Sequence, residues 1–215
     1  MMCNDNGFMS RRGLMTGGLA AATMLTGASN ALAGGDPPGT AGSDIGPFYP
    51  IQRPQDSDAD LVWIKGHKER ALGKVIEVSG RVLDRHGNPI RNATLELWQA
   101  NAAGRYAHPN DISTAPLDPN FQGYATLKTG EDGEWRITTI KPAVYDSPIG
   151  LRTPHIHFDI QGRSHRLIAQ MYFADEAPTN AGDQLYKMLG PDAPTSVAGL
   201  SGESKYRWDV VLMDS

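Results

Sequence analysis

Two histidines stand two positions apart in the stretch RTPHIHFDI, residues 152–160. In an extended strand successive side chains point to opposite faces, so His155, His157 and Asp159 would share one face and the apolar residues between them the other. Strand rise separates the two histidine backbones by about 7 Å, which lets both imidazoles reach one metal ion. A strand with one solvent-exposed face shows the same alternation of polar and apolar residues. The histidine pair is therefore a candidate metal site and does not by itself establish one.

The chemistry of such a metal depends on the ligands that complete it. Because Cys3 is the only cysteine, zinc sites built from thiolates are excluded. Two histidines with a carboxylate, either Asp159 or Glu96, would suit Fe(II) or zinc. Tyrosine ligands would indicate Fe(III), because ionising a phenol at neutral pH costs roughly 4 kcal/mol and only a strongly acidic cation offsets that cost. The chain has seven tyrosines, and their positions alone do not select among them.

The elements that must position these residues are strands. From Lys74 onward apolar and polar residues alternate in short segments separated by turns such as DRHGNP and GEDG. Only residues 183–189, DQLYKML, predict a short helix. The predicted strands are KVIEVSGRVL, ATLELWQ, GYATLKT, EWRITTI, PHIHFDI, RLIAQMYFA and YRWDVVLM. Many short strands with regular turns predict an all-β fold with an antiparallel β-sandwich core.

The chain divides into three predicted segments. Residues 1–33 combine the pair Arg11 and Arg12 with a Gly/Ala/Thr-rich stretch and the small-residue sequence ALA, which predicts a twin-arginine-type export signal. Residues 34–58 are rich in Pro, Gly and Asp, and an extended N-terminal arm is predicted over residues 34–73. Residues 74–215 form the predicted β-sandwich domain with the candidate site. We therefore expect a periplasmic or extracellular protein.

Composition narrows the class of partner. The chain of 215 residues is 40% hydrophobic and 20% charged, with a formal net charge of −4. It contains no run of basic residues, so neither nucleic-acid binding nor, after removal of the signal, membrane binding is expected. A small-molecule partner is the expectation that remains.

Six motifs occur in a characteristic order, and together they resemble the intradiol ring-cleavage dioxygenase family. They are GRVLDRHGNPIRNATLELWQANAAGRYAHPND, APLDPNFQGY, TTIKPAVY, RTPHIHFDI, LIAQMYF and YRWDVVL. The resemblance runs from about residue 44 to residue 213 and is greatest to the β subunits of the protocatechuate-cleaving members. It implies a β-sandwich that holds one non-haem Fe(III) through Tyr106, Tyr145, His155 and His157.

The same resemblance implies an activity and further site residues. Members of this family insert O2 between the two hydroxyl-bearing carbons of a catechol and form a cis,cis-muconate. By position, Tyr145 would leave the metal and act as a base, Arg152 would place a fixed positive charge beside the anionic ring, and Gln170 would orient the substrate by hydrogen bonding.

The chain also departs from the family pattern. The segment DSPIGLRTP between Tyr145 and His155 is shorter than expected in the protocatechuate enzymes, and it lacks the tryptophan that usually follows the tyrosine. The family pattern therefore does not assign the residues that form the wall of the substrate pocket, and Tyr49 in GPFYP is one candidate lining residue. In the protocatechuate enzymes an α subunit completes this pocket, so a partner subunit or a homo-oligomer is a further expectation.

Two alternatives compete with this hypothesis. Residues 78–140 also resemble transthyretin-like β-sandwich modules, which are not catalytic and bind other molecules, although this likeness does not explain the paired histidines. The second alternative is an Fe(II) or zinc enzyme in which His155, His157 and a carboxylate bind the metal. In that enzyme Tyr106 and Tyr145 would not be metal ligands.

Overall fold

The computed structural model describes residues 35–213, of which 36–213 belong to one compact unit. The predicted export signal at residues 1–33, with Cys3, lies outside the described residues. In the part of the chain that is described, no helix is long and apolar enough to span a membrane.

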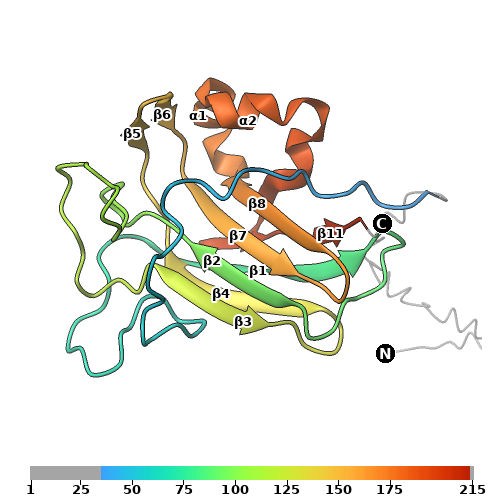
Figure 1. Cartoon of the computed structure of the whole chain (residues 1–215), viewed down its shortest axis with the longest axis horizontal. Coiled ribbons are helices and arrows are strands. Elements are labelled where there is room, and N and C mark those ends of the chain that lie inside the picture. Colours follow the sequence, from blue (N-terminus) through green and yellow to red (C-terminus); the bar gives the residue numbers. More distant parts are fainter. Residues whose placement is uncertain (1–34, 214–215) are drawn as a thin grey trace, which may run out of the picture. The chain divides into compact units, whose positions relative to one another are not determined.

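Strands dominate the fold, as predicted (Figure 1). They are β1 (Val75–Asp84), β2 (Thr94–Trp98), β3 (Tyr124–Lys128), β4 (Glu134–Ile140), β5 (Tyr145–Ser147), β6 (Gly150–Arg152), β7 (His155–Gln161), β8 (Arg166–Phe173), β9 (Val197–Gly202), β10 (Lys205–Arg207) and β11 (Val210–Leu212). Short helices and 3-10 turns lie between β8 and β9: η1 (Ala174–Glu176), α1 (Ala177–Gly182), α2 (Gln184–Met188) and η2 (Gly190–Ser196). The helix predicted at residues 183–189 is α2.

The large sheet is mixed, which differs from the antiparallel sandwich that the sequence predicts. Its strand order is β11-β1-β10-β9-β8-β7-β2-β3, with β4 also paired to β1, and β5 and β6 form a separate hairpin. The pairs β1–β10, β1–β11 and β8–β9 are parallel, whereas the others are antiparallel. Parallel neighbours need a long crossover, and residues 174–196 supply one between β8 and β9. The all-β prediction is confirmed, and the antiparallel sandwich is not.

Strands β1, β2 and β7, which come from different parts of the large sheet, contribute side chains to the same hydrophobic core. It contains Val78 and Val82 of β1, Leu95 and Leu97 of β2, and Phe158 of β7. Alternation in β7 sends its apolar side chains into this core, so its histidines must face the other side. Both faces of β7 are covered, because every residue from position 155 to 160 is buried.

Residues 35–73 run along the domain with no helix or strand except an isolated bridge between Asp60 and Thr138. Backbone hydrogen bonds attach this segment to distant strands, from Thr40 N to Val211 O at 3.0 Å and from Ser43 N to Ile168 O at 2.8 Å. The boundaries after residues 33 and 73 stay predictions.

Candidate active site

The four predicted metal ligands lie together. His155 and His157 on β7 point their Nε2 atoms at each other across 3.2 Å, and Tyr106 Oη lies 3.4 Å from His155 Nε2. The ring of Tyr145 lies 5.5 Å from the ring of Tyr106 and 5.7 Å from the ring of His155. Three side chains are almost fully buried and Tyr145 is partly buried. Two residues of β7, the first residue of β5 and a loop residue thus come together from three parts of the chain.

Both histidines are held as neutral imidazoles. Burial lowers the pKa of His155 to about 3 and that of His157 well below its usual value. The Nδ1 atom of His155 lies 2.6 Å from the carbonyl oxygen of Thr153, which can only accept a hydrogen bond. The proton of His155 is therefore on Nδ1, and its Nε2 presents a lone pair.

The donor set fits a trivalent cation. Burial raises the pKa of Tyr106 well above its usual value and also raises that of Tyr145, so neither phenol would ionise at neutral pH without a strong positive charge beside it. A lone pair on His155 Nε2, a facing imidazole nitrogen and two phenol rings are the groups that such a cation would require. The residues present therefore fit Fe(III) better than a softer or divalent ion.

Two glycines allow the segments that build the site to approach closely. Gly104 has φ +77°, and a Cβ there would collide with the carbonyl oxygen of Val144, next to Tyr145. Glycine thus lets the loop of Tyr106 pass against the segment of Tyr145. Gly46 has φ +74°, and a Cβ there would lie 3.3 Å from the ring of His157.

Aromatic residues from the arm and from β2 cover the site. Phe48 stacks on Tyr106 with ring centroids 4.5 Å apart and also meets Tyr145 edge-on at 6.2 Å. Trp98 stacks on His157 at 4.9 Å, and the edge of Tyr49 contacts Trp98 at 5.0 Å. Tyr49, the predicted lining residue, therefore lies behind Trp98, and Phe48 is the arm residue that touches the tyrosines. The sequence pattern gave no indication that Phe48 and Trp98 contact the site.

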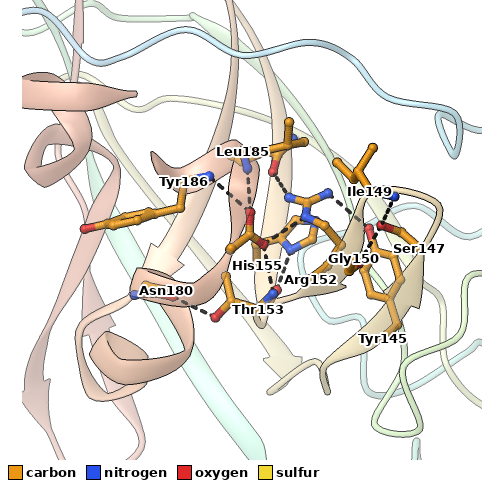
Figure 2. Close-up of polar contacts among 12 residues, drawn as sticks. Tyr145, Ser147, Ile149, Gly150, Arg152, Thr153, His155, Asn180, Leu185 and Tyr186 are labelled. Atoms are coloured by element: carbon orange, nitrogen blue, oxygen red, sulfur yellow. Dashed lines mark hydrogen bonds and ion pairs between the residues drawn. The ribbon is translucent and has the colours of Figure 1, made fainter. Parts of the chain in front are cut away.

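Arg152 lies at the edge of the ligand cluster, beside Tyr145 (Figure 2). Its Nη1 is 3.4 Å from Tyr145 Oη, its Nη2 donates to Gln170 Oε1 at 2.5 Å, and its Nε donates to Asp183 at 2.8 Å. Tyr172 also donates to Gln170 Oε1, at 3.0 Å. Arg152 and Gln170, two of the expected site residues, are thus in contact, and Asp183 is a contact that the sequence did not predict.

The two carboxylates considered as alternative ligands are engaged elsewhere. Glu96 binds Arg53 at 2.6 Å and the hydroxyl of Tyr49, and Asp159 binds Arg166 at 2.7 Å. Among residues 35–213, no three His, Cys, Asp or Glu side chains cluster around a possible metal position. The structure therefore offers no support for a site of two histidines and a carboxylate.

A cavity of about 320 Å³ lies between the arm and the loops that follow β2. Phe48, Trp98 and Tyr106 line it, together with residues 117–118 and 121–124. Of the four predicted metal ligands only Tyr106 lines this cavity, so the cavity lies beside the candidate metal site and does not contain it.

Comparison with known proteins identifies the class. Residues 45–213 match the family model described as Dioxygenase. Over 182 residues the chain is 41% identical to the protocatechuate 3,4-dioxygenase beta chain of Burkholderia cepacia, which covers 77% of this chain and 76% of that one. The chain belongs to the intradiol ring-cleavage dioxygenase family. Within that family it is similar to the chains of protocatechuate 3,4-dioxygenase, including the alpha chain of Pseudomonas putida, with 30% identity over 158 residues covering 69% of this chain and 76% of that one.

Solved structures agree on the fold. The dioxygenase domain of a dioxygenase carbohydrate-binding protein fusion from Streptomyces sp. SirexAA-E superposes with a TM-score of 0.62 at 27% identity, covering 83% of this chain and all of that one. Hydroxyquinol 1,2-dioxygenase from Pseudomonas putida DLL-E4 superposes with a TM-score of 0.65 at 20% identity, covering 82% of this chain and 67% of that one.

Proposed function

We propose that this protein is an Fe(III)-dependent intradiol dioxygenase that inserts O2 between the two hydroxyl-bearing carbons of a catechol and forms a cis,cis-muconate. The observation that carries the proposal is the convergence of Tyr106 Oη with the Nε2 atoms of His155 and His157, next to Tyr145. These four side chains would hold the iron. Bound Fe(III) would make the catechol acidic and draw electron density from its ring, so that a ring carbon reacts with O2.

The surrounding residues supply binding and proton transfer. Tyr145 is the more exposed of the two tyrosines and its Oη faces Arg152, so this oxygen is the one we assign to accept a catechol proton. Arg152 provides a fixed positive charge in a buried position, where its attraction for an anionic ring is poorly screened. Gln170 is held by Arg152 and Tyr172 and can orient the substrate through its amide.

The relatives suggest the first substrates to test. Two of them are named for protocatechuate, and others for hydroxyquinol and catechol. Oxygen uptake by the purified protein with protocatechuate, catechol, hydroxyquinol and chlorocatechols should be stoichiometric with substrate for at least one member of the panel. Mass spectrometry of the product should show a muconate with both atoms from labelled O2. Cleavage outside the two hydroxyls, or no oxygen uptake with any of these compounds, would refute the proposal.

The setting of the reaction is proposed from the sequence. We infer export through the twin-arginine-type signal of residues 1–33, and hence catechols met outside the cytoplasm. Since relatives are named as alpha and beta chains, we also infer assembly with a partner chain or with copies of itself. The native mass of the protein expressed alone, together with its activity, distinguishes these two forms of assembly.

A further inference from the structure

Asp183 connects the short helix α2 to the active-site arginine. Its side chain is fully buried, and each carboxylate oxygen serves a different element. Oδ1 accepts hydrogen bonds from the backbone N–H groups of Leu185 at 2.8 Å and Tyr186 at 3.1 Å, which caps α2. Oδ2 accepts from Arg152 Nε at 2.8 Å and from Thr153 N at 2.9 Å. Figure 2 labels the partners in these contacts, Leu185 and Tyr186 of α2 on one side and Arg152 at the end of β6 with the adjoining Thr153 on the other.

The bond to Nε fixes the plane of the Arg152 guanidinium. A guanidinium is planar, so one strong hydrogen bond on its Nε edge determines where its terminal N–H groups point. With Asp183 on that edge, the other two nitrogens reach Gln170 Oε1 and Tyr145 Oη. Asp183 is also the counter-ion of a buried charge, because the side chains of the pair are only 6% and 0% exposed.

We propose that Asp183 is a positioning residue that fixes the orientation in which Arg152 presents its N–H groups to Tyr145 and to the anionic catechol. The part that concerns the catechol rests on the proposed function. The Asp183 side chain makes no hydrogen bond to any of the four predicted metal ligands, so its effect on the site would pass through Arg152.

The test is the variant Asp183→Asn in two backgrounds. An asparagine keeps one oxygen for the cap of α2 but turns an N–H donor toward Arg152 Nε and Thr153 N, so the cap is preserved and both of these contacts are lost. The loss at Thr153 N is common to both backgrounds, so the difference between the backgrounds reports on Arg152. In the native background we expect kcat/KM for the catechol to fall about 10- to 100-fold at unchanged iron content. In an Arg152→Ala background the same change should alter kcat/KM by less than about twofold, because Asp183 then has nothing to orient.

Asn180 provides a matched control in the same segment. It accepts a hydrogen bond from Thr153 Oγ1 at 2.7 Å and donates to Phe173 O at 2.9 Å, and neither of these bonds involves Arg152. Asn180→Ala should lower the melting temperature while kcat/KM per iron stays within about twofold of the native value. A purely structural role for Asp183 predicts the same behaviour for both variants.

A second readout needs no metal. In the metal-free protein labelled with nitrogen-15, the Nε–H resonance of Arg152 should exchange slowly with water, because Asp183 holds it in a buried hydrogen bond. Asp183→Asn should abolish this slow exchange, and Asn180→Ala should retain it.

The possible results separate the positioning role of Asp183 from the proposed function. Native kcat/KM in Asp183→Asn, equal losses in both backgrounds, or loss of iron in Asp183→Asn would each overturn the positioning role. Absence of ring cleavage in the native protein would instead refute the proposed function, and the exchange of the Arg152 resonance would still report whether Asp183 holds the guanidinium.

Discussion

Single residues set the separation of the two tyrosines at the site. Tyr106 and Tyr145 come from segments that approach only because Gly104 lacks a side chain, since a Cβ there would meet the backbone of Val144 and lie 3.3 Å from Tyr145 Cβ. A substitution at this position should therefore disturb metal binding as well as folding.

The variant Gly104→Ala tests this explanation, with Gly66→Ala as its matched control. Both glycines have positive φ, +77° and +89°, but nothing lies within 4 Å of a Cβ at Gly66. We expect Gly66→Ala to lower the free energy of unfolding by about 1 kcal/mol through backbone strain. Gly104→Ala should lower it by about 1 to 3 kcal/mol more through collision, and should reduce the bound iron. Urea unfolding and metal analysis measure both quantities, and equal behaviour of the two variants would contradict the explanation.

The sequence predicts some site residues from local pattern and others only from family likeness. His155 and His157 could be predicted as a pair from the sequence alone, because residues two positions apart in any strand point to the same face. Tyr106, Tyr145 and Gln170 lie on segments outside β7, and no local pattern indicates that those segments meet the histidines. Arg152 lies three residues before His155 and pairs with Tyr145 across the β5–β6 hairpin, but its role was inferred only from family likeness.

Contacts made by the tertiary fold were missed. Asp183 is the first residue of the predicted helical segment 183–189, where an aspartate is a typical N-cap, and this signal could have identified half of its role. Its second oxygen binds Arg152, 31 positions away along the chain, which only the fold reveals. Phe48 could not be assigned because the route of the arm depends on contacts with distant strands.

At the scale of elements, alternation predicts where strands lie but not their direction. The seven predicted strand segments correspond to β1, β2, β3, β4, β7, β8, and β10 with β11. Strands β5, β6 and β9 were missed: the hairpin of β5 and β6 is too short to show a periodicity, and the β9 sequence VAGLSG has no regular alternation of apolar and polar residues. Strand direction depends on the crossover through η1, α1, α2 and η2, which brings β9 back parallel to β8. The mixed sheet was therefore not predictable from strand patterns.

At the scale of the whole molecule, the proposed export pathway determines where the protein would have to fold. The only cysteine lies in the predicted signal, so the remainder of the chain must be stabilised by its core or by the proposed metal. A twin-arginine-type pathway carries folded proteins, which would allow the iron to bind before export.

Replacing Arg11 and Arg12 together by lysine tests the localisation. The charge is retained but the arginine pair is lost, so we expect the full-length protein to accumulate inside the cell in active form. Fractionation followed by immunoblotting measures its distribution, with unaltered secretion of an unrelated exported protein as the control. Undiminished export of the variant would remove the twin-arginine interpretation.

The most direct test of the whole account is the visible absorption spectrum of the purified native protein, compared with that of Tyr106→Phe. Tyrosinate bound to Fe(III) absorbs visible light by charge transfer, so the native protein should be burgundy and contain about one iron per chain, while the variant should lose most of this absorption. Tyr206→Phe, which removes a phenol from another buried tyrosine whose hydroxyl binds Asp175, should keep the colour. A colourless native protein, or a Tyr106→Phe variant with the native spectrum, would contradict the ferric site.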